Sequence, residues 1–297
     1  MSSYHLAGIV PVAGEPLDFK FEWGDAMMPI APNYLAIERA VYECAWAGCE
    51  TIWIVCNDDT KPLIRHRLGE YVQDPVWIGR RLDVFPSESR KPIPIYYVPI
   101  KAKDVGKRDC LAWSILHGAM TAFQISSKLS KWVIPKRNYV AFPWGVYDPS
   151  ILREHRKIIS SDQGFLLEHE GKTIRDGEYL GFTFDKDDFV NARHVIREGT
   201  GMYNSKVLED GLFPREKLPK EERWSARFFS LDKVFNCVII DNKKVVTLPW
   251  YYNIDAWDKY CTYLGSPESK QVQRPHPIFL SYHEWNEIGV DDEDGKK

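Results

Sequence analysis

Apolar residues gather in short runs along the first 160 residues, and each run is followed by a stretch with helical spacing. Continuous apolar runs predict strands that are covered on both faces, as in a parallel sheet. The predicted strands are residues 5–12, 51–56, 93–100 and 138–144, and the predicted helices are residues 34–47, 60–72, 106–126 and 148–159. Four strand-then-helix units in this order predict a doubly wound, mostly parallel α/β sheet.

The first of these helices has clear ends. Asn33 is a suitable N-cap and Gly48 a suitable C-terminal stop. Apolar side chains repeat at helical spacing on one face, while Glu38, Arg39 and Glu43 take the opposite, polar face. The pattern therefore predicts an amphipathic helix that covers a buried sheet.

The pattern changes after residue 160. Strand-like runs alternate with the turn pairs Glu170-Gly171 and Asp176-Gly177, which predicts a hairpin region. Further helices are predicted at 186–197, 230–237 and 256–264, and a strand at 244–254. We expect residues 1–160 to form an α/β core and residues 161–297 to continue the same sheet with hairpin and helical additions, within one compact domain.

Composition and charge exclude several function classes. A net charge of −3 gives no general attraction to nucleic acid or to an anionic membrane. Because no apolar run approaches about 18 residues, no membrane span is expected. The six cysteines form no Cys-x-x-Cys pair, and the N-terminus has no basic start, which together predict reduced core cysteines in a cytosolic protein.

Aromatic residues are frequent, with 11 Trp, 15 Tyr and 14 Phe. An aromatic-rich core is the simpler interpretation. The alternative is an aromatic surface that binds a flat ligand, a protein partner or a second copy of the chain.

Motifs with a fixed spacing are absent. The sequence has no Gly-x-x-x-x-Gly-Lys-Ser/Thr loop, no Gly-x-Gly-x-x-Gly, no Gly-x-Ser-x-Gly and no His-Glu-x-x-His. His276 and His283 are interpreted as surface or core residues. The polar turn 57–59 follows a predicted strand, where it either caps the next helix or faces a ligand.

The order of the segments is more informative than any motif. The segments are LAGIVPVAGEP (6–16), MMPIAPNYLAIERAVYECAWAGCETIWIV (27–55), VGKRDCLAWSILHGAM (105–120), YVAFPWGVYDPSILREHRK (139–157) and NIDAWDKY (253–260). In this order the chain resembles a divergent member of the sugar nucleotidyltransferase family. That resemblance implies a Rossmann-like sheet of the GT-A type.

The resemblance also implies a reaction. It is Mg²⁺-dependent nucleotidyl transfer from a nucleoside triphosphate to a sugar phosphate, in which metal and cationic side chains neutralise the charge that develops on the phosphate oxygens. The residues that it implies are Lys20, Asp148 and Asp255 in catalysis, with the two acids holding Mg²⁺, and Gly8, Gly14, Lys107 and Arg108 around the nucleotide.

The chain departs from the family's pattern in its first loop and at one acid. Residues 8–16 contain no Arg. The Lys expected before Met-Pro is not at its usual distance; Lys20 is the nearest, and Asp25 occupies the neighbourhood. A strict alignment places Trp144 or Gly145 at the early metal-binding acid, with Asp148 a few residues late. Both Asp148 and Asp255 also suit helix caps, and Lys107 and Arg108 also suit a solvated first turn.

Two other functions follow from these departures. One is a catalytically inactive protein of the same fold that acts as a binding or structural component of a larger assembly. The other is a glycosyltransferase, for which Asp185-Lys186-Asp187 is the nearest Asp-x-Asp candidate.

Overall fold

The computed structural model describes residues 5–14, 24–78, 91–105, 110–199, 229–238 and 243–275. Lys20, Lys107, Arg108, His276 and His283 lie outside the described residues, so their predicted roles stay predictions.

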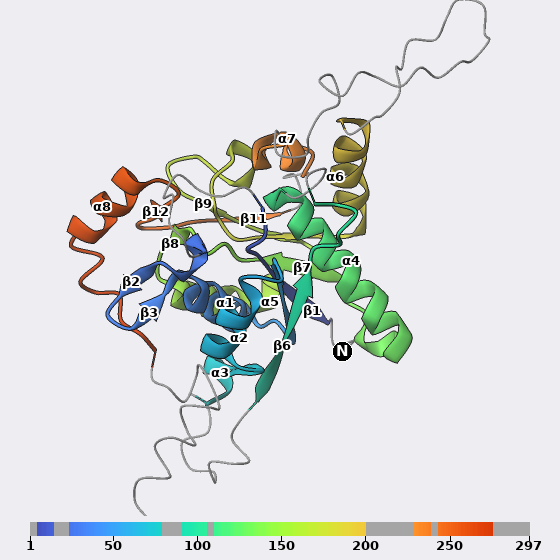
Figure 1. The fold of residues 1–297 in the computed structure, drawn as a ribbon, viewed down its shortest axis with the longest axis horizontal. Helices are drawn as coiled ribbons and strands as arrows, with labels where there is room; N and C mark the ends of the chain where they lie inside the picture. Colours follow the sequence, from blue (N-terminus) through green and yellow to red (C-terminus); the bar gives the residue numbers. More distant parts are fainter. Residues whose placement is uncertain are drawn as a thin grey trace, which may run out of the picture.

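An eight-stranded mixed sheet forms the centre of the described structure (Figure 1). Its strands, from one edge to the other, are β11 (Lys244–Thr247), β9 (Phe165–Glu168), β10 (Phe182–Phe184), β7 (Arg137–Val140), β1 (Leu6–Pro11), β4 (Thr51–Cys56), β6 (Pro92–Pro99) and β5 (Tyr71–Gln73). Strands β7, β1, β4 and β6 are parallel neighbours, as are β9 and β11, whereas β10 and β5 run antiparallel to their neighbours. The predicted α/β sheet is confirmed, and three strands of the second half extend it.

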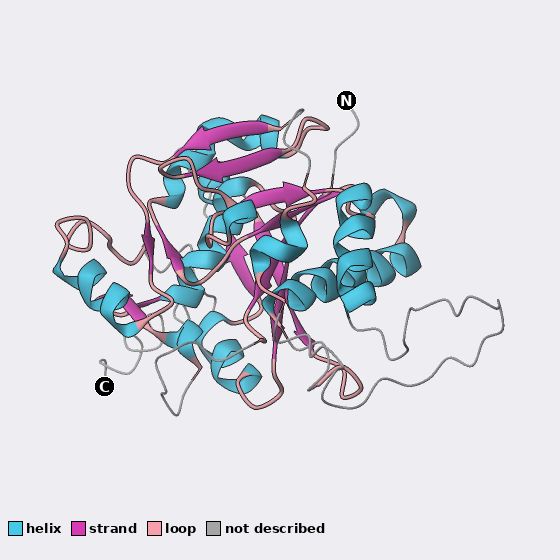
Figure 2. Ribbon diagram, turned by 90° about the horizontal axis from the view of Figure 1, so that it is seen from above, coloured by secondary structure: helices cyan, strands magenta, loops and turns pink. Residues whose placement is uncertain are grey.

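Helices cover both faces of this sheet, as Figure 2 shows from above. In β1, Leu6 and Val10 point into one core, while Ala7 and Ile9 point into the other. The first core is covered by α1 (Ala36–Ala47), α2 (Lys61–Leu68), α5 (Leu152–Ile159) and α8 (Trp257–Gly265), with α3 (Pro75–Ile78) packed beside α1. The second core is covered by α4 (Leu111–Leu129), α6 (Lys186–Gly199) and α7 (Leu231–Phe235). Burial on both faces explains why β1 and β4 are apolar throughout.

Four short 3₁₀ turns and two small ladders complete the described elements. The turns are η1 (Asp25–Met27), η2 (Lys131–Val133), η3 (Pro149–Ile151) and η4 (Ile174–Asp176). The ladders pair β2 (Pro29–Ala31) with β3 (Tyr34–Leu35), and β8 (Gly145–Val146) with β12 (Tyr252–Asn253). Within the described ranges, no helix combines the length and the hydropathy needed to cross a membrane.

The N-terminal end of α1 differs from the prediction. Asn33 does not cap the helix, because its backbone adopts a left-handed φ of 55° in the turn between β2 and β3. Leu35 is the N-cap instead, and its N–H donates to Glu38 Oε2 at 2.8 Å. The stop at Gly48 is confirmed, with a left-handed φ of 90°.

The polar face of α1 is also buried. Glu38, Arg39 and Glu43 are each at most 1% exposed. The helix packs against the sheet on one side and against α5 and η3 on the other, so its second face is covered as well. The expectation of one covered face was therefore wrong for this helix.

Other helix and strand boundaries differ from the predicted ones where glycine or proline interrupts the element. The helix expected at 60–72 ends at Leu68, since Gly69 turns the chain into β5. The strand expected at 244–254 divides into β11 and β12, and Pro249, which has no N–H to donate, lies between them. The Glu170-Gly171 turn is confirmed by two backbone hydrogen bonds between His169 and Lys172.

The aromatic residues contribute heavily to both cores. Buried examples run from Tyr34 to Tyr263, while the exposed large aromatic side chains of the described residues are Tyr96, Phe123 and Trp257. The interpretation as an aromatic core is supported, and the aromatic partner surface stays a prediction.

Candidate functional site at the carboxyl edge of the sheet

The carboxyl ends of the parallel strands define the edge at which ligands bind in open α/β sheets. From β1 the chain crosses to β4 on one side and later returns to β7 on the other. Strand order therefore reverses between β1 and β7, and the loops that follow Pro11 and Val140 border this point.

Gly8 and Gly14 have different surroundings near this point. A Cβ at Gly8 would lie 2.8 Å from Cys44 Sγ and 3.1 Å from Cys49 Sγ, so Gly8 lets α1 pack closely on β1. A Cβ at Gly14 would lie 2.8 Å from the backbone nitrogen of Leu111. Gly14 thus lets the first loop approach the N-terminal turn of α4, where free N–H groups favour anions.

Asp148 acts as a cap in this structure. Its Oδ1 accepts the Ser150 N–H at 2.9 Å and its Oδ2 accepts the Ser150 hydroxyl at 2.8 Å, at the start of η3. Asp148 is exposed. The capping alternative considered from sequence is the arrangement observed.

Asp255 forms an ion pair instead of a cap. Its Oδ1 lies 2.7 Å from the Lys259 Nζ, one helical turn later, and its side chain is 25% exposed. Its own N–H donates to Asn253 Oδ1 at 3.0 Å.

The two acids do not converge. In the β8–β12 ladder, Val146 faces Tyr252, and the Ile254 N–H donates to the Trp144 carbonyl. Continuing this antiparallel register places Asp255 next to residue 143, whereas Asp148 lies beyond the opposite end of the ladder. The described residues contain no group of three His, Cys, Asp or Glu side chains able to hold a metal ion.

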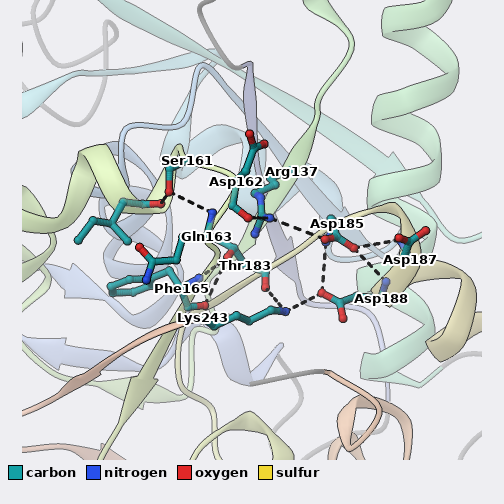
Figure 3. A network of polar contacts seen from close by, with 11 residues as sticks. Arg137, Ser161, Asp162, Gln163, Phe165, Thr183, Asp185, Asp187, Asp188 and Lys243 are labelled. Carbon is teal, nitrogen blue, oxygen red and sulfur yellow. Dashed lines mark hydrogen bonds and ion pairs between the residues drawn. The ribbon is translucent and has the colours of Figure 1, made fainter. Parts of the chain in front are cut away.

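The Asp-x-Asp sequence at 185–187 lies at the opposite, amino edge of the sheet. Figure 3 shows Asp185, Asp187 and Asp188 within one network of polar contacts. Asp185 Oδ1 accepts the backbone N–H groups of Asp187 and Asp188 at 2.9 and 3.1 Å, at the start of α6. Asp188 also forms a buried ion pair with Lys243 at 2.6 Å. This network caps a helix and joins β11 to it, so the geometry does not support the glycosyltransferase alternative.

A pocket of about 580 Å³ opens at the carboxyl ends of β9 and β11. Its walls come from the turn after β9, the segment between β11 and α8, and α8 itself. The lining residues are His169, Glu170, Lys172, Glu178, Pro249, Trp250, Tyr251, Tyr252, Asn253, Lys259 and Thr262.

Glu178 is the acid of this pocket whose carboxylate is held by side-chain hydrogen bonds. Its Oε2 accepts the Tyr251 hydroxyl and the Asn253 amide, each at 3.2 Å, and its Oε1 lies 3.9 Å from Lys172 Nζ. The Tyr251 hydroxyl in turn accepts the Tyr179 N–H at 3.0 Å. Burial, together with the nearby carboxylate of Glu178, raises the pKa of Tyr251 well above its usual value, so this hydroxyl stays a neutral donor.

His169 has one nitrogen engaged by the backbone. Its Nδ1 lies 3.3 Å from the Leu248 carbonyl, which requires the proton on Nδ1, and its ring packs 5.7 Å from the Tyr251 ring. The Nε2 atom lies 4.0 Å from Glu170 Oε1. The pocket thus combines aromatic faces with two carboxylates, an amide, an imidazole and two ammonium groups.

Sequence reasoning singled out Asp255, whose partner Lys259 lines this pocket, but missed the pocket itself. The Glu170-Gly171 turn was predicted as a turn, and Tyr251 as part of a strand. The signal available was the clustering of Trp250, Tyr251 and Tyr252 directly before Asn253.

Comparison with known proteins gives matches in structure alone. No family model matches the chain, and no curated protein matches it. A provisionally assigned glucose-1-phosphate thymidylyltransferase from Bacillus anthracis, in complex with a sucrose, superposes with a TM-score of 0.54 at 10% identity, over 91% of this chain and 98% of that one. A UDP-glucose pyrophosphorylase complexed with UDP-glucose superposes with a TM-score of 0.51 at 13% identity, over 90% and 99%. The chain has the fold of these sugar nucleotidyltransferases, and the resemblance found in its sequence is confirmed at the level of the fold.

Proposed function

We propose that the protein transfers a nucleotidyl group from a nucleoside triphosphate to a sugar phosphate, which it holds in the pocket at the carboxyl edge. The observation that carries this proposal is the Glu178–Tyr251–Asn253 cluster between aromatic walls, next to the Asp255–Lys259 pair. The similar structures are themselves described as a thymidylyltransferase and a pyrophosphorylase.

The pocket suits a sugar ring. Trp250 and Tyr252 offer apolar faces, while Glu178 and Asn253 offer an acceptor and an amide at fixed positions. Hydroxyl groups need such oriented partners, because a buried polar group without one loses about 1–3 kcal/mol. Together, these groups suit the recognition of a ring that is apolar on its face and polar at its edge.

The lysines suit the phosphate of the same ligand. Lys172 and Lys259 line the pocket from the turn after β9 and from α8. In the proposed reaction a phosphate oxygen of the sugar phosphate attacks the α-phosphorus of the nucleotide, and pyrophosphate leaves. Lys20, Lys107, Arg108 and Gly14 remain proposed contacts of the nucleotide.

The resemblance implies Mg²⁺ as cofactor, and the described residues do not fit a shared metal site. Mg²⁺ prefers several oxygen ligands in octahedral geometry. Asp148 caps η3 at one end of the β8–β12 ladder, and Asp255 at the other end is joined to Lys259. We therefore derive no step through a metal.

The test measures pyrophosphate release from pairs of nucleoside triphosphates and sugar 1-phosphates. One pair is expected to react, and Glu178→Gln is expected to raise the KM for the sugar phosphate about tenfold, because an acceptor oxygen becomes an N–H donor. Glu154→Gln, an exposed acid on α5, serves as control and should leave KM unchanged. Failure of every pair to react, with the chain folded, would remove the proposed reaction.

A second candidate function is ligand binding without turnover, as a binding or structural component of a larger assembly. The observation that favours it is Trp144, which stands where an acid was expected and is only 3% exposed. Binding of UDP-glucose, seen by calorimetry together with no pyrophosphate release, would support this candidate over the first.

A further inference from the structure

We propose that Lys259 supplies, beside Asp255, the positive charge that a divalent cation supplies between two carboxylates, so that a sugar phosphate or nucleotide sugar binds here without metal. This inference rests on the proposed function, because it concerns the ligand of the same pocket. It adds a named cation and a metal independence that the fold alone does not imply.

The position of Lys259 follows from helix geometry. Residues four apart on a helix face each other, and α8 begins at Trp257, so Lys259 lies in its first turn and reaches back to Asp255. The Nζ–Oδ1 distance is 2.7 Å, and the lysine side chain is 49% exposed. Lys259 also lines the 580 Å³ pocket, so the side chain paired with Asp255 borders the ligand space.

The surroundings of Asp255 suit an ammonium better than Mg²⁺. The hydrogen bond next to the ladder joins the Ile254 N–H to the Trp144 carbonyl, so the side chain that follows the ladder opposite this end is Pro143, which brings no carboxylate. Among the described residues, Asp255 belongs to no group of three His, Cys, Asp or Glu side chains that could hold a metal ion. A metal at Asp255 would compete with the ammonium that already neutralises this carboxylate.

The ammonium retains capacity for a ligand. It carries three donors, of which the described contact with Asp255 uses one. The neighbouring carboxylate of Glu178 is occupied by two neutral donors, Tyr251 and Asn253. Lys172 also lines the pocket, so a phosphate bound there has a second cation available.

The experiment measures binding of UDP-glucose and glucose 1-phosphate to the full chain by isothermal titration calorimetry, in EDTA and in Mg²⁺. We expect the same Kd in both buffers. Lys259→Met is expected to raise Kd about tenfold, the size of one lost hydrogen bond between charged groups. Lys270→Met, which removes a lysine lining a different hollow, is the matched control and should leave Kd unchanged.

The Asp255→Asn variant distinguishes Lys259 as the cation from a metal bound at Asp255 by the direction in which Kd changes. If Lys259 is the cation, removal of the Asp255 charge leaves Kd unchanged or lower, because the ammonium is no longer neutralised. If a metal binds at Asp255, the same variant raises Kd and abolishes any effect of Mg²⁺. Native circular dichroism of each variant verifies that the fold is kept.

The failures of the two proposals are distinguishable. Binding that requires Mg²⁺, or that survives Lys259→Met, overturns the role of Lys259 and leaves the proposed function standing. No binding of either ligand in either buffer overturns both proposals.

Discussion

Arg39 and Glu43 form an ion pair inside the protein, with 2.9 Å between Nη2 and Oε2 and both side chains at most 1% exposed. The pair joins α1 to the sheet, since the Tyr139 hydroxyl on β7 donates to Glu43 Oε1 at 2.7 Å. Arg39 Nη2 also donates to the Phe142 carbonyl at 2.6 Å, and its guanidinium lies 4.8 Å from the Tyr147 ring centre. The segment that carries Trp144 is therefore anchored by charge as well as by packing.

Glu43→Ala is expected to lower the free energy of unfolding by about 3–5 kcal/mol, because it leaves the Arg39 charge buried without its partner. Urea denaturation followed by Trp fluorescence measures this change. Glu70→Ala removes an exposed partner of Arg65 and should cost less than about 1 kcal/mol. Equal losses in the two variants would show that the buried pair has no special role.

Ionisation of the Cys56 thiol is expected to lower the free energy of unfolding at alkaline pH. Burial raises the pKa of the Cys56 thiol to about 12, above the value of about 8.5 that a free thiol has. The folded state therefore holds the proton more tightly, and this contribution is fully present below about pH 8.5 and is lost as pH rises towards 12.

The measurement compares urea denaturation of the wild type and Cys56→Ala from pH 8 to pH 11. Ionising tyrosines affect both proteins alike, so the difference in free energy of unfolding isolates the thiol. That difference should shrink by about 1.4 kcal/mol per pH unit at most. Parallel curves over this range would contradict a buried, proton-holding thiol.

Gly145→Ala is expected to destabilise the protein by about 1–3 kcal/mol, the range for overpacking. The added Cβ would overlap the Tyr179 carbonyl oxygen, which is backbone, and would lie 3.1 Å from Tyr251 Cε2. Thermal unfolding measures the loss. Gly265→Ala, where a Cβ has open space, is the control and should leave the melting temperature within error or raise it.

Tyr251→Phe is expected to cost about 1–3 kcal/mol of stability and to weaken sugar phosphate binding, because it removes the acceptor of the Tyr179 N–H and a donor to Glu178. Chemical denaturation and calorimetry measure the two effects. Tyr252→Phe removes a hydroxyl that donates to Glu268 at 2.9 Å and serves as comparison. If both variants bind alike, the Glu178–Tyr251 pair does not organise the pocket.

The strands of the first half were predictable because strands that are buried on both faces consist of continuous apolar runs, such as residues 51–56. The burial of Glu38, Arg39 and Glu43 was not predictable. It depends on α5 and η3, which cover a face of α1 that periodicity assigns to polar residues. Arg39 and Glu43 have hydrogen-bond partners about 100 residues later in the chain, and Glu38 pairs with Arg67 and Arg274. No local pattern reports these distant partners.

The candidate site was predictable only in part for the same reason. The turn at 170–171 follows from local propensity, but it becomes a pocket wall only when Trp250 and Tyr251 are brought beside it. Asp255 was singled out by segment order alone. Its pairing with Lys259 follows from their spacing of four residues at the start of α8, which sequence reasoning did not use.

Contacts between the two ends of the chain constrain the time at which the protein can fold during synthesis. The Tyr263 hydroxyl on α8 donates to the Ile30 carbonyl at 2.8 Å, across 233 residues, and the Tyr260 hydroxyl donates to the Pro29 carbonyl at 2.6 Å. Figure 1 shows α8 and the β2–β3 ladder side by side. At about 5–20 residues per second, a ribosome needs on the order of ten to fifty seconds between making one partner and the other. The β2–β3 segment therefore emerges from the ribosome long before α8, which covers it in the folded protein. We expect chaperones to bind this segment in that interval.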